Sequence, residues 1–144
     1  MLRARLFSVL AMLLGLASFS CLAQDFKTYP GAKLDENASR VASSTVPGMQ
    51  SQVYTTADSF DKVYAFYKGL YKEHTLRRPA RRPASTPEVR IAFFLLDGAK
   101  DLPSSGYWMK VQRPWMSGAD GKDVRDVTVI QTVRGHGEPR NRRQ

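Results

Sequence analysis

The most regular segment of the chain reads Ser59-Phe-Asp-Lys-Val-Tyr-Ala-Phe-Tyr-Lys-Gly-Leu-Tyr-Lys72. Its apolar side chains recur every three or four positions, the spacing of one helix face: Phe60, Val63, Phe66, Tyr67 and Leu70. Asp58 or Ser59 can cap the first turn, and Asp61 suits the positive end of the helix dipole. The spacing therefore predicts an amphipathic helix over about 59–72, with one face packed against another part of the chain.

Four segments around this helix carry the signals of β-strands. Residues 49–56 alternate imperfectly and end in residues that favour strands, whereas residues 89–96 are apolar on both faces, as a central strand is. Residues 107–113 alternate, and residues 124–134 are rich in β-branched side chains. Because glycine-bearing turns separate the last three segments, they predict an antiparallel three-strand meander. The predicted fold class is α+β, with the helix on one face of an antiparallel sheet.

Residues 24–47, ahead of the first strand, are mixed in character. They contain a turn signal, Tyr29-Pro-Gly-Ala32, and a polar stretch over 35–44 for which no element is predicted. The turn motif, Tyr54-Thr-Thr-Ala-Asp-Ser59 and the helix residues Val63 and Phe66-Tyr-Lys68 together resemble a pattern of small exported bacterial envelope proteins of unknown function. The resemblance covers 29–72 by motif and 89–133 by layout alone. It implies export and an α+β fold, and it supplies no catalytic residue.

The N-terminus has the pattern of a secretory signal peptide over 1–23. Arg3 and Arg5 form a basic start, and an uncharged run of 18 residues from Leu6 to Ala23 follows. We expect cleavage after Ala23, and hence a periplasmic or secreted protein. Two alternatives stay open: an uncleaved membrane anchor and a lipoprotein modified at Cys21.

Composition supports one small exported domain. The chain has 144 residues, 42% of them hydrophobic, and a formal net charge of +9. Cleavage after Ala23 would leave 121 residues, a charge of +7 and no cysteine, which excludes a disulfide framework. We expect a single α+β domain over 24–134, a basic Pro/Arg loop at 75–88 and a disordered basic tail at 135–144.

The Pro/Arg loop carries the candidate ligand-binding residues. Two copies of Arg-Arg-Pro-Ala place four guanidinium groups on a segment that proline keeps extended: Arg77, Arg78, Arg81 and Arg82. Guanidinium groups bind phosphate in a bidentate manner. The expected partner is thus an anionic lipid, lipopolysaccharide or wall polymer. A solvated loop that only aids solubility is the alternative interpretation.

Signals for catalysis are weak. The chain contains no Gly-x-Ser-x-Gly nucleophile motif and two histidines: His74, expected at the helix end, and His136 in the tail. The acids between Asp120 and Asp126 fit a turn better than a calcium loop. No catalytic residue, metal ligand or cofactor is therefore assigned. Five aromatic residues could instead form a stacking platform for a ligand: Tyr64, Tyr67, Tyr71, Trp108 and Trp115.

The sequence predicts an exported, non-enzymatic envelope protein that contacts an anionic envelope component through its Arg-Pro loop. One alternative is a protein-interaction or assembly module with a protein partner. A second is a hydrolase with an unrecognised site. The export signal argues against a cytoplasmic nucleic-acid role. The ligand, the oligomeric state and the physiological role stay open.

Overall fold

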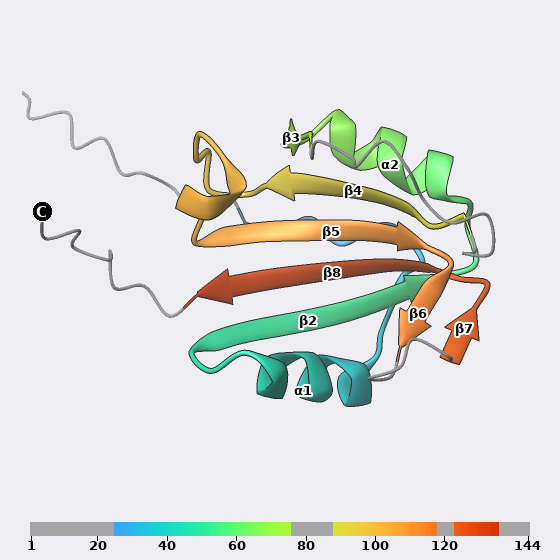
Figure 1. Ribbon diagram of the computed structural model, residues 1–144. Helices are drawn as coiled ribbons and strands as arrows, with labels where there is room; N and C mark the ends of the chain where they lie inside the picture. The colour runs from blue at the N-terminus through green and yellow to red at the C-terminus, as the bar shows by residue number, and fades with distance from the viewer. Residues whose placement is uncertain (1–24, 76–87, 118–122, 136–144) are drawn as a thin grey trace, which may run out of the picture.

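The computed structural model describes residues 25–75, 88–117 and 123–135. Within them two α-helices pack on a largely antiparallel sheet, which confirms the predicted α+β class. Figure 1 shows the sheet with α1 along one edge and α2 toward the other. In chain order the elements are β1 (Lys33–Leu34), α1 (Glu36–Thr45), β2 (Met49–Thr56), α2 (Phe60–Lys68), β3 (Lys72–His74), β4 (Arg90–Leu95), the 3₁₀ turn η1 (Leu102–Ser104), β5 (Tyr107–Arg113), β6 (Trp115–Ser117), β7 (Asp123–Arg125) and β8 (Thr128–Gly135).

The main sheet has six strands in the order β1-β2-β8-β5-β4-β3, and every neighbouring pair is antiparallel. The predicted meander is present as the neighbours β4, β5 and β8. The predicted strand 124–134 is wrong in one respect: it is divided at Asp126 and Val127. The first part, β7, pairs with β6 in a separate two-stranded hairpin. The carboxylate of Asp126 binds Arg113 of β5 at 3.0 Å, which holds the break against the sheet.

Helix α2 begins where the sequence indicates and ends earlier. The Ser59 hydroxyl accepts a hydrogen bond from the Lys62 amide, so Ser59 is the N-cap. The helix ends at Lys68 instead of Lys72, because Gly69 is its C-cap and Lys72 already pairs with Leu95 in the sheet. His74 consequently lies in strand β3 and not at the helix end.

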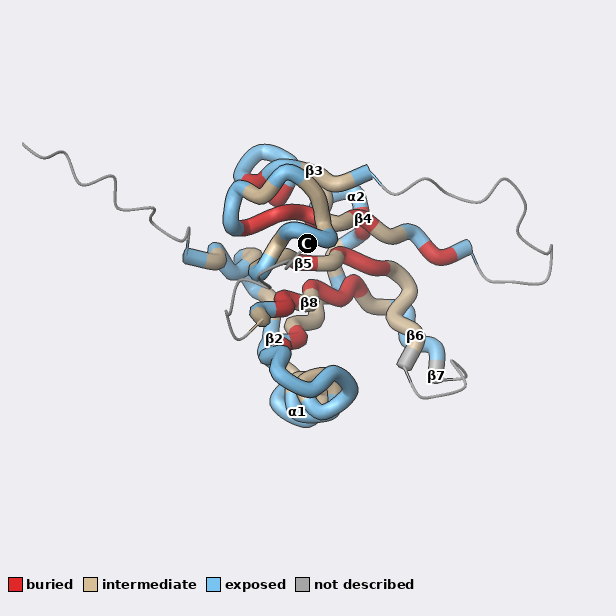
Figure 2. Tube along the Cα trace, turned by 60° about the vertical axis from the view of Figure 1, so that its left-hand side comes forward, coloured by how far each residue is buried: buried red, intermediate tan, exposed pale blue. Residues whose placement is uncertain are grey.

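The main hydrophobic core lies between α2 and one face of the sheet. It includes Phe60, Val63 and Tyr67 of the helix, together with Phe94 of β4 and Met109 of β5. Figure 2 shows the buried residues concentrated along the central strands. Burial raises the pKa of Tyr67, with partial compensation by the nearby Tyr29 backbone amide. The Tyr67 hydroxyl nevertheless has no hydrogen-bond partner among the described residues. The main cluster of buried apolar side chains among the described residues thus lies on this face of the sheet.

Helix α1 was not predicted, because the segment 35–44 was interpreted as merely polar. Asp35 is its N-cap, with a side-chain oxygen that accepts from the Ala38 amide. The helix has no fully buried residue. It is joined to strand β2 by two serine hydroxyls: Ser39 accepts from the Val53 amide at 2.8 Å, and Ser43 accepts from the Ser51 amide at 2.9 Å. Side chains thus satisfy backbone groups that an exposed edge strand would leave unpaired.

Candidate functional site

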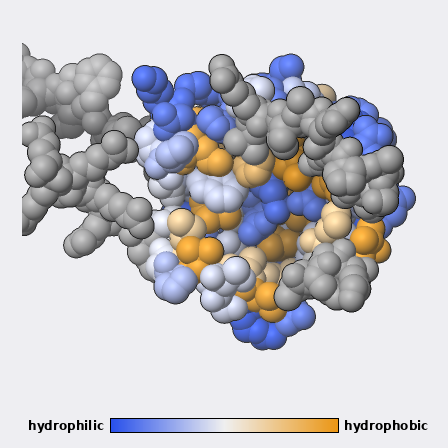
Figure 3. All heavy atoms as spheres, in the orientation of Figure 1, coloured by the Kyte–Doolittle hydropathy of each residue, from blue (hydrophilic) through white to orange (hydrophobic). Residues whose placement is uncertain are grey.

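A groove of about 760 Å³ lies on the sheet face opposite α2. Its walls are helix α1 and the β6–β7 hairpin, and strands β2, β8 and β5 form its floor. Figure 3 looks onto this face and shows hydrophilic atoms at its centre with hydrophobic atoms around them. The groove arises because α1 packs at the β2 edge and leaves the middle of this face uncovered.

Strand register places two polar side chains side by side on the groove floor. Gln131 of β8 lies between Val53 of β2 and Lys110 of β5 in one cross-strand row. The next row on the same face consists of Ser51, Val133 and Trp108. All six of these residues line the groove. Alternation along three strands therefore builds a floor in which an ammonium and a carboxamide lie among apolar side chains.

Lys110 is the most unusual residue of the floor. Its side chain is half-buried, and the desolvation that results lowers the pKa of the lysine. No carboxylate forms an ion pair with it among the described residues, and no described residue accepts a hydrogen bond from its Nζ. A desolvated ammonium without a counter-ion is energetically costly. The fold tolerates this cost on the floor of a groove, where a ligand can reach the amine.

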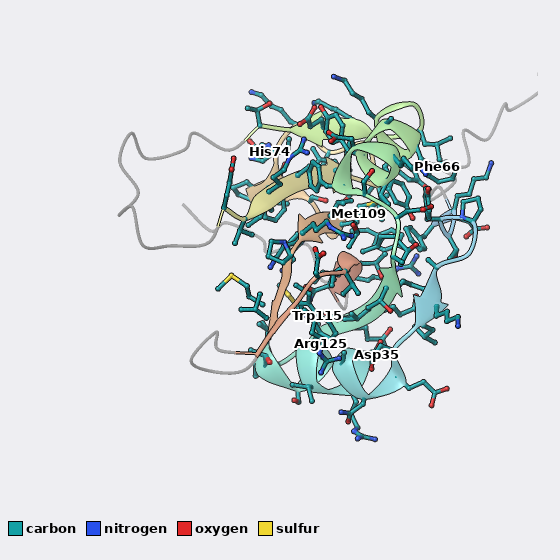
Figure 4. All side chains as sticks on the ribbon, turned by 90° about the vertical axis from the view of Figure 1, so that its right-hand side faces the viewer. Asp35, Phe66, His74, Met109, Trp115 and Arg125 are labelled. Atoms are coloured by element: carbon teal, nitrogen blue, oxygen red, sulfur yellow. The ribbon has the colours of Figure 1, made fainter. Side chains whose placement is uncertain are left out.

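The hairpin wall is aromatic and apolar. Trp115 and Met116 of β6 line the groove, and the Arg125 guanidinium lies 4.7 Å from the centre of the Trp115 ring. Figure 4 shows Trp115, Arg125 and Asp35 near one another on the α1 side of the molecule, away from Phe66 of α2. Trp108 completes the aromatic lining from the floor. A ligand in the groove would therefore contact both tryptophans of the chain.

The helix wall exposes aliphatic side chains to the groove. Val41 of α1, the C-cap residue Val46 and Met49 at the start of β2 line this side of the groove, although they are 57%, 44% and 38% exposed to solvent. Ala38 and Ala42 lie on the same wall. Single exposed apolar residues are ordinary, but a group that lines one groove marks a binding surface. The wall can therefore bury apolar ligand atoms that the protein itself leaves in water.

The charges of the groove favour an anion. Its charged lining residues are Lys110, Arg125 and Asp35. One carboxylate oxygen of Asp35 already accepts the cap hydrogen bond from Ala38. The net charge of the lining is thus positive, and Lys110 is the cation at its floor.

The residues predicted to bind a ligand do not form one site among the described residues. Arg77, Arg78, Arg81 and Arg82 lie outside the described residues. The predicted aromatic platform is divided between the two faces of the sheet: Tyr64, Tyr67 and Tyr71 pack around the α2 core, whereas Trp108 and Trp115 line the groove. His74 lies in β3, and Asp120 is outside the described residues. Within the described ranges no three His, Cys, Asp or Glu residues gather as a metal site would need.

The sequence interpretation did not identify Lys110, Gln131 or the α1 wall as parts of a site. Alternation in 107–113 does place Trp108 and Lys110 on one face, but an alternating strand usually turns such a face to solvent. The signal that was missed is Asp35 followed by Ala38, Val41 and Ala42, which is a cap ahead of a helix-spaced apolar stripe.

Comparison with protein-family models, with curated proteins and with solved structures found no match. Among the described residues, no helix has the length and apolar character needed to cross a membrane.

Proposed function

We propose that the protein is an exported, non-enzymatic envelope protein whose task is binding, and that the groove between α1, the sheet and the β6–β7 hairpin is its ligand site. The observation that carries this proposal is the amine of Lys110, which has no acceptor among the described residues and lies on the floor of a groove with exposed aliphatic walls. The groove has the size of small-molecule sites, which are mostly apolar with a few polar groups that orient the ligand.

The proposal keeps the predicted anionic contact of the Arg-Pro loop and adds a second contact. In sequence, Arg77 to Arg82 fall between β3 and β4, outside the described residues, whereas the groove is bounded by α1 at the β2 edge. An anionic envelope component would thus bind the arginines of the loop through charge and would place part of its structure in the groove. Both contacts are of the binding kind and neither requires a catalytic group.

The groove is tested with N-phenyl-1-naphthylamine, a neutral dye that fluoresces in apolar sites. We expect the protein to bind the dye, and we expect Ala42→Phe, which adds a ring to the groove wall, to weaken binding at least tenfold. Ala65→Phe is the matched control, because Ala65 is an exposed residue of α2 that does not line the groove.

Equal dye affinity in Ala42→Phe and Ala65→Phe would place the dye elsewhere and contradict the proposal. Circular dichroism of each variant verifies that the fold is retained.

A further inference from the structure

We infer that the ligand of the groove is a single-chain amphiphile with one anionic headgroup, which binds at Lys110 and Gln131 while its chain lies along α1. The inference rests on the proposed function and specifies its ligand class. It follows from the charge of the floor, the nature of the walls and their relative positions.

The headgroup position is set by Lys110. Its amine has no acceptor among the described residues, and desolvation disfavours its charged form. An anion on the amine offsets that disadvantage, because opposite charges attract more strongly at a partly desolvated site than in bulk water. Asp35 does not fulfil this role: it forms no ion pair with Lys110, and it caps α1. The missing counter-ion is therefore one that a ligand can supply.

Gln131 makes the site suitable for a headgroup with several oxygens. Its carboxamide lies directly opposite Lys110 in the ladder and forms no hydrogen bond with another described side chain. The amide can donate to one oxygen while the ammonium donates to another. Carboxylates and phosphates both offer this arrangement, so the shared chemistry is a compact oxyanion.

The walls favour an alkyl chain as the remainder of the ligand. Val41, Val46 and Met49 form an aliphatic strip on one side, and Trp115 and Met116 lie on the other. Methionine adapts its shape to apolar partners, and indole rings pack well against methylene groups. Each methylene that leaves water should tighten binding about fourfold while the chain still fits.

The experiment uses intrinsic fluorescence, since both tryptophans of the protein line the groove. The probes are dodecanoate, dodecyl phosphate, dodecanol and dodecyltrimethylammonium, each below its micelle-forming concentration. We expect at least one of the two anions to bind roughly tenfold to hundredfold more tightly than dodecanol, the range for a charged hydrogen bond. The preferred anion identifies a carboxylate or a phosphate headgroup. The cation should bind most weakly.

Lys110→Met should remove the preference for the anions over dodecanol while dodecanol affinity is retained. Lys33→Met is the matched control, because Lys33 is exposed on β1 and does not line the groove. If Lys110→Met does not fold, Lys110→Gln removes the charge with a smaller change in polarity. Octanoate and decanoate complete a chain-length series, which should show affinity rising with length.

The outcomes separate the two proposals. Dodecanol binding as tightly as both anions, or anion preference unchanged in Lys110→Met, overturns the anionic headgroup and leaves a binding groove. Absence of binding for every amphiphile and for N-phenyl-1-naphthylamine overturns both the ligand class and the proposed function.

Discussion

At the scale of single residues, Lys110 is a partly desolvated cation on the groove floor. A lysine on the middle strand of a sheet would usually extend to water, yet here the α1 wall and the hairpin restrict its hydration. The same side chain that would hold an anion therefore destabilises the folded protein when the groove is empty. This cost makes the free energy of unfolding depend on pH, and the dependence can be measured without knowledge of the ligand.

The pH dependence follows from the lowered pKa of Lys110. Between that pKa and the ordinary value for lysine, the unfolded chain binds more protons than the folded chain, so the free energy of unfolding rises with pH. Below the lowered pKa the destabilisation is complete. We expect Lys110→Met to be more stable than the parent protein at neutral pH, by roughly 1 kcal/mol. The difference should shrink as the pH approaches the ordinary lysine pKa.

Denaturant unfolding at a series of pH values checks this expectation, with Lys33→Met as the control for a change of net charge. A Lys110→Met variant that is less stable than the parent protein at neutral pH would show that the amine has a favourable partner in the folded state.

At the scale of elements, α1 differs from α2 in what it contributes. Helix α2 buries Phe60, Val63 and Tyr67 in the core, whereas α1 buries no residue completely. Its attachment depends instead on hydrogen bonds between Ser39, Ser43 and the backbone of β2. The apolar side chains of α1, namely Ala38, Val41 and Ala42, are not buried in the core and therefore line the groove.

We expect Ser39→Ala and Ser43→Ala each to lower the free energy of unfolding by about 1–3 kcal/mol, because each leaves a backbone group of β2 without its partner. Ser44→Ala is the matched control on the same helix, since the Ser44 hydroxyl donates only to Val41 within the helix. Denaturant unfolding gives the stabilities. Amide hydrogen exchange at Ser51 and Val53 should accelerate in the corresponding variant.

Equal stability of the Ser43→Ala and Ser44→Ala variants, with unchanged exchange at Ser51, would contradict the edge-pairing role.

The elements show which parts of the fold could be read from local sequence. Residues 49–56 and 107–113 were predicted with the observed bounds, because their alternation matches their place in the sheet. Helix α2 was predicted at its start, since Asp58 or Ser59 was expected as the cap and Ser59 is the cap observed. Its end was missed because Lys72–His74 joins the sheet, a long-range pairing that helix periodicity does not reveal. The hairpin β6–β7 is a local pairing, and it was missed because residues 124–134 were interpreted as one continuous strand.

The groove could not be predicted in the same way. Trp108 and Lys110 were placed on one strand face, but whether that face meets solvent or a wall depends on where α1 packs. That position is set by hydrogen bonds between Ser39 and Ser43 and a strand that follows them in sequence. The site is thus a product of tertiary arrangement more than of any motif.

At the scale of the whole molecule, the arginines of the predicted loop and the residues that line the groove come from different segments of the sequence. In sequence, the four arginines of the predicted loop fall between β3 and β4, outside the described residues, whereas the groove is lined by α1, the sheet and the β6–β7 hairpin. Under the proposed function the two segments are two contacts for an anionic partner, one through the arginines of the loop and one through the groove.

The loop contact predicts salt-sensitive retention on anionic liposomes. Replacement of Arg77, Arg78, Arg81 and Arg82 by alanine should weaken retention at least tenfold at low salt, since each cation near an anionic surface contributes about 1 kcal/mol. A matched variant removes the same charge from scattered exposed positions: Lys27, Lys33, Lys62 and Lys68. Equal retention of the two variants in a sedimentation assay would show that total charge matters and the loop does not.

The two faces of the sheet have a consequence for how such a chain can change over generations. Because the α2 face holds most of the apolar core, substitutions on the groove face leave the main source of stability intact. Residues that contact a ligand can therefore vary while the chain continues to fold. A sheet with this division lets the binding preference of the groove change by single substitutions while the core on the other face keeps the protein folded.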